Sequence, residues 1–172
     1  MQTESDIRRI DSGRARLSDN VVGSLTHSVL AELLANDQPL SFQNVQRETD
    51  RQLPPDLAVT YRMSIRQKVG AAIQRYDGRF RRQGWTLVAP EVVARDVAFD
   101  LLWVSDSGTL EVDEIKAGLN AERHISSISA QCESQVRSGN EVYGSDFAGV
   151  RLVLLAAGRS IYFENPAARG EG

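Results

Sequence analysis

The segment FDLLWVSDSGTLEVDEIKAG, residues 99–118, places acidic side chains and a lysine within a pattern of two strands joined by a tight turn. Side chains alternate along a strand, so Glu114 and Lys116 share one face of the second strand. A hairpin centred near residue 107 sets Asp100 of the first strand roughly opposite Glu114. The hairpin is therefore expected to bring two carboxylates and one ammonium group together.

Two carboxylates at close range repel each other unless a cation lies between them, and such oxygen ligands suit Mg²⁺ or Mn²⁺. The adjacent lysine would help to activate an attacking water or stabilise negative charge on a phosphodiester under attack. The chain has 18 Arg and 2 Lys, so a lysine is a rare choice of cation here. The arginine guanidinium is broad and scarcely gives up its proton, whereas the lysine ammonium is compact, so a lysine at position 116 points to a chemical role. Asp113 faces the other way and is the weaker candidate for a ligand.

The alternative without a catalytic role is an edge strand whose alternating charges face solvent. Because Asp100 is expected opposite Glu114 and an Asn-capped helix is expected after the second strand, the pattern favours a catalytic hairpin.

Apolar spacing predicts the elements that must position this hairpin. A helix over residues 20–36, with Asp19 or Asn20 as N-cap, is followed by a polar connector with at most one helical turn, ending at Pro54-Pro55. A second helix over 57–82 is stopped by Gly84. Three strands are then expected at 85–89, 97–104 and 109–116, followed by a helix over 120–139 capped by Asn120 and ended by Gly139, a buried strand at 150–157 and a further short strand at 160–163.

Length and composition indicate one domain, residues 1–172, with a flexible leader at 1–18 and a flexible tail at 165–172. No apolar run reaches the roughly 18 residues that cross a bilayer, and the amino terminus lacks the apolar core of a signal peptide. A cytoplasmic location without a membrane partner is therefore expected. The single cysteine, Cys132, lies on an apolar helix stripe and is expected in the core rather than as a nucleophile.

The charge is unevenly distributed along the chain. Residues 1–90 carry 13 Lys/Arg against 10 Asp/Glu, whereas residues 91–172 carry 7 against 13. Seven cations gather on the second helix and just after it, opposed there by Asp77: Arg62, Arg66, Lys68, Arg75, Arg79, Arg81 and Arg82. This is either a solvated helix face or a phosphate-binding surface beside the acids.

With these elements in place, the chain resembles the PD-(D/E)XK nuclease superfamily, and within it the RecB-like nucleases. DEIKAG is similar to that group's DYKTG, and VGSLTHSVLAELL is similar to its upstream helix, with a glycine, a histidine and then leucines. The element order from Tyr61 to Ala156 agrees, and the resemblance covers about residues 20–156. It implies a restriction-endonuclease-like α-β-β-β-α-β core, with a mixed central sheet flanked by helices and an extra N-terminal helix.

The resemblance also implies a set of site residues. Asp100 and Glu114 would bind Mg²⁺ or Mn²⁺, with the Ile115 carbonyl and His27 as further ligands, and Lys116 would be the catalytic lysine. A lone helical histidine is more often structural, so for His27 the ligand role and a core position both stay open.

The family has a glutamine in the helix after the lysine, followed four residues later by a tyrosine. Gln131 and Gln135 both lie in that helix, and either could reach the site. Neither is followed by the tyrosine, because Gln135 and Gly139 stand at those positions. The four-cysteine cluster of the CRISPR-associated members is absent as well.

Residues and resemblance together predict a metal-dependent deoxyribonuclease. Contacts with the DNA backbone are expected from Arg62, Arg66, Lys68, Arg75, Arg79 and Arg82, and a helicase or another subunit could deliver the DNA. Two other functions stay open. One is a nucleic-acid-binding or assembly subunit that keeps the nuclease fold without turnover, and the other is a structural α/β interaction domain that binds no divalent metal.

Overall fold

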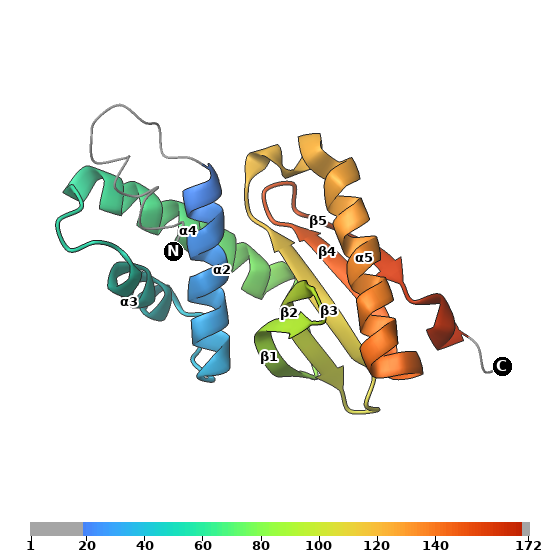
Figure 1. The fold of residues 1–172 in the computed structure, drawn as a ribbon. Coiled ribbons are helices and arrows are strands. Elements are labelled where there is room, and N and C mark those ends of the chain that lie inside the picture. Colours follow the sequence, from blue (N-terminus) through green and yellow to red (C-terminus); the bar gives the residue numbers. More distant parts are fainter. Residues whose placement is uncertain (1–18, 170–172) are drawn as a thin grey trace.

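A computed structural model describes residues 19–169, in which a five-stranded sheet is covered by helices on both faces (Figure 1). In chain order the elements are α2 (Asp19–Ala35), α3 (Phe42–Gln52), α4 (Val59–Arg79), β1 (Trp85–Ala94), β2 (Val97–Ser105), β3 (Leu110–Lys116), η1 (Leu119–His124), α5 (Ile125–Tyr143), η2 (Gly144–Asp146), β4 (Phe147–Leu154), β5 (Arg159–Glu164) and η3 (Pro166–Arg169). The predicted α/β class, with a mixed sheet flanked by helices, is confirmed. None of the helices in this part of the chain is both long and apolar enough to span a membrane. The predicted leader at 1–18 lies outside the described residues.

The strands lie in the order β1-β2-β3-β4-β5. Neighbours pair antiparallel except β3 and β4, which run parallel and are connected through η1 and α5. A parallel pair needs such a crossover because the chain must return to the edge where the first strand began. The crossover lays α5 over one face of the sheet, opposite α2 and α4, and the carboxyl ends of β3 and β4 lie side by side (Figure 1).

Two apolar cores fill the space on the two faces of the sheet. The helices α2, α3 and α4 pack over Leu101, Trp103 and Ile115 on one face, and α5 packs over the other. Cys132 is fully buried in the α5 core, as predicted, and burial raises the pKa of its thiol to about 12. The thiol is therefore protonated at neutral pH and is a core residue rather than a nucleophile.

The helix α3 has 11 residues where the sequence predicted a connector with at most one helical turn, so that prediction was wrong. Ser41 caps this helix, because its hydroxyl accepts the Asn44 amide at 3.3 Å. Val45 and Thr49 are buried one turn apart. A single aliphatic position marks the buried face of this polar helix, which is too little for apolar periodicity to reveal it.

The helix after β3 differs from the prediction at both ends. Asn120 lies within η1 and does not cap α5, which begins at Ile125. Gly139 does not end α5 either, since the helix continues to Tyr143. A Cβ atom at Gly139 would collide with the ring of Phe147, so this glycine allows β4 to approach the helix closely.

The remaining boundaries differ from the prediction mainly at β1 and β4. The strand β4 runs over Phe147–Leu154, three residues earlier than the predicted 150–157. The strand β1 continues past 89 to Ala94, through a register shift between Leu87 and Ala89. At the start of the tail that the sequence predicts to be flexible, Asn165 is buried and donates a hydrogen bond to the Phe147 carbonyl at 2.6 Å. A buried side-chain amide of this kind is held because leaving it unpaired would cost free energy.

Candidate active site

The predicted hairpin brings its charged residues to one end of the sheet. Leu101 pairs with Asp113 in β2 and β3, which is the register expected from a turn centred near residue 107. One step beyond this pair, the Asp100 carboxylate accepts the Ile115 amide at 2.7 Å. Asp100 and Glu114 therefore lie on adjacent strands at the same level.

Asp100 occupies a break in the side-chain alternation of β2. Phe99 and Leu102 both pack on the α5 side of the sheet, whereas Leu101 packs on the α2 side. Strand amides point along the plane of the sheet, so a carboxylate that accepts the Ile115 amide lies near that plane. Groups from both faces of the sheet can reach Asp100 there.

Glu114 is buried on the α5 face, and three donors bind its carboxylate. Lys116 Nζ and Gln131 Nε2 donate to Oε1 at 2.5 and 2.9 Å, and Gln135 Nε2 donates to Oε2 at 2.6 Å. Both glutamines that the sequence left open thus contact the site. Gln135 also donates to the Ala98 carbonyl at 2.8 Å, while its own Oε1 is buried with no hydrogen-bond partner in the described part of the chain.

His27 reaches the site from α2, on the opposite face. Its Nε2 donates to the Ile115 carbonyl at 2.5 Å, and its Nδ1 lies 3.6 Å from Asp100 Oδ1. The side chain is 27% exposed, so His27 is not a core histidine, and it contacts two of the groups predicted to bind metal. A cation held by both His27 and the Ile115 carbonyl would replace their hydrogen bond.

Burial and neighbouring charges shift two pKa values at the site. Burial raises the pKa of the Asp100 carboxyl, with His27 opposing the shift and repulsion from Glu114 adding to it. Burial alone would lower the pKa of Lys116, but the Glu114 carboxylate outweighs this and raises it above its ordinary value. Lys116 is therefore an ammonium ion at neutral pH and serves as a fixed positive charge.

A cleft of about 570 Å³ opens beside these residues, between α2 and the segment that leads from β3 into α5. His27, Ile115 and Lys116 line it together with Gly23. A Cβ atom at Gly23 would meet nothing within 4 Å, so the helix surface there is open to a ligand. Gly23 lies one turn before His27, and this spacing is the sequence signal that puts both on the cleft.

Three of the cations in or just after α4 that were predicted to bind DNA have partners within the protein. Arg66 is paired with Asp50, and Arg62 lies 3.5 Å from the same carboxylate. The side chain of Arg82 is 8% exposed and is paired with Asp113 at 2.9 Å. A nucleic acid would have to draw these three arginines away from internal partners.

The other three predicted cations are more accessible. Lys68 is exposed. Arg75 donates to the Leu155 carbonyl at 2.7 Å, and the Leu155 amide donates to the Lys116 carbonyl, so Arg75 lies at the same end of the sheet as the site. Arg79 is exposed and lies beside the turn that follows β4.

Asp113 faces α4, away from Glu114, as the alternation predicted. It is fully buried and accepts hydrogen bonds from Tyr76 at 2.9 Å, Arg151 at 2.6 Å and Arg82 at 2.9 Å. Two guanidinium groups compensate its charge, which makes it a structural residue rather than a ligand.

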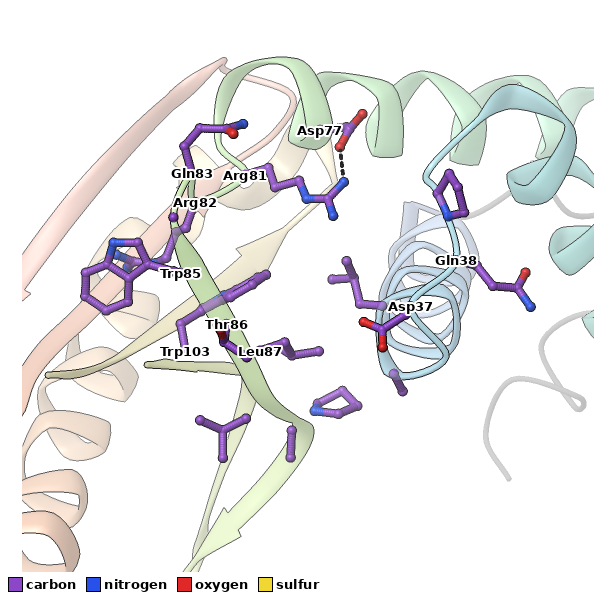
Figure 2. Close-up of a pocket in the computed structure, with 17 residues that line it drawn as sticks. Asp37, Gln38, Asp77, Arg81, Arg82, Gln83, Trp85, Thr86, Leu87 and Trp103 are labelled. Atoms are coloured by element: carbon purple, nitrogen blue, oxygen red, sulfur yellow. Dashed lines mark hydrogen bonds and ion pairs between the residues drawn. The ribbon is translucent and has the colours of Figure 1, made fainter. Parts of the chain in front are cut away.

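A larger pocket, of about 930 Å³, lies between the carboxyl-terminal ends of α2 and α4 and the strand β1. Figure 2 shows Trp103 and Leu87 on its sheet side and the Arg81–Asp77 ion pair, 3.0 Å long, on its rim. The charged rim groups Arg81 and Asp77 pair with each other. No residue of the predicted catalytic or metal site lines this pocket, whereas His27, Ile115 and Lys116 line the smaller cleft. The candidate site is therefore the smaller cleft.

Within residues 19–169 no group of three or more His, Cys, Asp or Glu side chains is placed to hold a metal ion. His27 and Asp100 face each other, whereas the Glu114 carboxylate is bound by donors from β3 and α5.

Comparison with models of known protein families gives no match for this chain, and comparison with curated proteins gives none either. What the protein does must therefore be inferred from the site itself.

Proposed function

We propose that this protein is a metal-dependent deoxyribonuclease of the PD-(D/E)XK type, which hydrolyses DNA phosphodiester bonds. The observation that carries the proposal is the meeting of Asp100, Glu114 and Lys116 at the ends of two adjacent strands, beside an open cleft. The order α4-β1-β2-β3-α5-β4 supports it, because it is the α-β-β-β-α-β order that the resemblance implies. In this interpretation α2 and α3 precede the nuclease core.

The donor groups at the site fit a hard divalent cation by their chemistry. Asp100 and Glu114 offer carboxylate oxygens, Ile115 a carbonyl oxygen and His27 an imidazole nitrogen, a set that suits Mg²⁺ or Mn²⁺. The raised pKa of Asp100 supports this fit, because it reflects a carboxylate whose charge a cation would stabilise. When bound, the cation would polarise a phosphoryl oxygen and lower the pKa of water.

The side chains around this cation site supply charge and orientation. Lys116, an ammonium ion held against Glu114, would stabilise negative charge on the phosphate under attack. Gln131 and Gln135 hold the two carboxylate oxygens of Glu114 from α5. Because these groups are positioned before a substrate arrives, little reorganisation is needed when charge develops.

The proposed surface for the DNA backbone is formed by Lys68, Arg75 and Arg79. Arg75 supports it best, since its contact with Leu155 sets it beside the end of β3. Lys and Arg side chains that neutralise phosphates release counterions from DNA, so the affinity of the protein for DNA would fall as the salt concentration rises.

The proposal is tested by incubating the purified protein with single-stranded, duplex and branched DNA in Mg²⁺, Mn²⁺ or EDTA. We expect cation-dependent cleavage that Lys116→Ala and Asp100→Ala each reduce by about 100-fold or more. Asp96→Ala removes an exposed carboxylate from the β1–β2 turn and is the matched control, expected to cleave at the natural rate. Cleavage that survives both site substitutions would come from a contaminant and would contradict the proposal.

A nucleic-acid-binding or assembly subunit without turnover is the second candidate. One observation favours it: Lys116, Gln131 and Gln135 already satisfy the Glu114 carboxylate. DNA binding without cleavage in every cation would support this candidate. A helicase or other subunit that delivers DNA is compatible with both functions, and a fully active, self-sufficient monomer would argue against such a partner.

A further inference from the structure

A small cavity lies against the candidate site, where α2 meets β1 and β2. It has a volume of about 10 Å³ and is lined by His27, Asp100, Ile115 and Glu91, together with aliphatic side chains of α2 and β2. A space of this size is on the order of what one water molecule needs. Three of its four named lining residues belong to the proposed cation site, and Glu91 is the fourth.

The register of the sheet explains how Glu91 comes to lie there. Pro90 pairs with Leu101 and Val92 with Phe99, which places Glu91 across from Asp100 on the neighbouring strand. The break in the alternation of β2 thus lies directly beside Glu91. No signal in the hydrophobic pattern marks Glu91, because the contact depends on the pairing of β1 with β2.

The backbone of Glu91 is strained. Its φ angle is 50°, in the left-handed region that favours glycine, although it lies inside a strand. Arg95, with φ of 56°, shares this conformation but sits in the two-residue turn between β1 and β2, where such angles are usual. Strained residues persist where the surrounding structure holds them, and they gather at functional sites.

No local interaction of the Glu91 side chain offsets this strain. In the part of the chain that the structure describes, its carboxylate has no hydrogen bond or ion pair, and the residue is exposed. Glycine would fit the backbone better at this position. The carboxylate therefore requires an explanation other than folding.

We propose that Glu91 of β1 is a further acidic residue of the cation site and acts there with Asp100 and His27. This inference rests on the proposed function, since it assigns a residue to the same Mg²⁺ or Mn²⁺ site. Glu91 adds a carboxylate to a donor set in which Glu114 is held by three other groups. Among the described residues the Glu91, Asp100 and His27 side chains are not placed to hold a metal ion together, so a bound cation would have to draw the exposed Glu91 carboxylate in toward the cavity.

The test measures binding of Mn²⁺ alone to the whole chain by calorimetry, without DNA, together with thermal unfolding in EDTA. Glu91→Gln keeps the size of the side chain and removes its charge, and we expect Mn²⁺ affinity to fall about 10-fold. Glu91→Gly should lose affinity equally but raise the melting temperature in EDTA, because it relieves the left-handed strain. Arg95→Gly relieves similar strain four residues away and should leave the affinity unchanged.

The outcomes separate this inference from the proposed function. If the natural chain binds Mn²⁺ and Glu91→Gln binds it equally well, the role of Glu91 is overturned while the cation site stands. If Glu91→Gly lowers the melting temperature in EDTA and leaves the affinity unchanged, Glu91 is a structural residue. If the natural chain binds no Mn²⁺, the proposed function fails and the inference fails with it.

Discussion

Glu114 organises the candidate site at the scale of single residues. Its two carboxylate oxygens hold Lys116 from its own strand and both glutamines from α5. The pKa of Lys116 is consequently raised, in spite of burial, and the side chain keeps its charge at neutral pH. Lys116 therefore acts as a compact cation at a fixed position rather than as a base.

Replacing Lys116 by arginine tests whether compactness matters. Lys116→Arg retains the charge but spreads it over a planar fork that does not fit the same space beside Glu114. We expect the rate of cation-dependent cleavage to fall about 100-fold. The free energy of unfolding should change by less than the roughly 3–5 kcal/mol that loss of a buried partner costs, because the positive charge beside the buried Glu114 is kept. Single-turnover rates and urea unfolding measure the two quantities, and a near-natural rate would mean that charge alone is sufficient.

The pKa of Asp100 predicts how stability depends on pH. Because this pKa is raised on folding, the folded protein binds more protons than the unfolded chain between the ordinary value of 3.8 and the raised one. The free energy of unfolding contributed by Asp100 is therefore lost as the pH rises through that window. We expect Asp100→Asn to be more stable than the natural chain at neutral pH in EDTA, and to show less of this loss.

Urea unfolding at neutral pH and at a pH below 3.8 measures this difference. The stabilising effect of Asp100→Asn should shrink at the lower pH, where the natural carboxyl is protonated as well. An equal effect at both pH values would show that charge at Asp100 is not its cause.

At the scale of elements, the close approach of α5 to β4 sets the position of both glutamines. Gly139 provides that approach, since a side chain there would meet Phe147. Gln135 lies one turn before Gly139 on the same buried side of α5, where it reaches Glu114. A displaced helix would therefore disturb the site as well as the core.

Gly139→Ala should destabilise the fold by about 1–3 kcal/mol, because the added methyl group overpacks the contact with Phe147. Gly70→Ala is the matched control: this glycine is also buried in a helix, but its nearest potential contact, Gln46, is 4.0 Å away. The control should gain up to about 1 kcal/mol from helix propensity. Urea unfolding compares the variants, and similar effects of both substitutions would contradict the close approach.

At the scale of the whole molecule, one buried ionic cluster ties the helical layer to the sheet. Asp113 of β3 binds Tyr76 of α4, Arg151 of β4 and Arg82, which follows α4. Burial, followed by the Asp113 charge, raises the pKa of Tyr76 well above its ordinary value, so the phenol stays a hydrogen-bond donor. The cluster fixes the end of α4 against the strands that carry Glu114 and Lys116.

Asp113→Ala should cost about 3–5 kcal/mol of stability, because two arginines would be left buried without their common partner. Asp77→Ala removes a carboxylate from the more exposed Arg81 pair and should cost less than about 1 kcal/mol. Chemical denaturation measures both variants. A small effect of Asp113→Ala would show that the cluster does not hold the layers together.

Local sequence was sufficient to predict the hairpin and its three charged residues. A period of two along each strand and a turn centred near residue 107 are properties of neighbouring residues, so the register of Leu101 with Asp113 followed directly. The burial of Cys132 and the opposite facing of Asp113 followed from the same periodicities. These features need no knowledge of how distant segments pack.

The rest depended on contacts between residues far apart in the chain. His27 meets the Ile115 carbonyl across 88 positions, and Glu91 comes to Asp100 only through the pairing of β1 with β2. The arginines in and just after α4 looked like a uniform basic face, but three of them are paired within the protein, Arg62 and Arg66 with Asp50 and Arg82 with Asp113. Which donors meet a buried carboxylate is settled when the layers pack together, because desolvation makes each unpaired group costly and selects the partners that satisfy it.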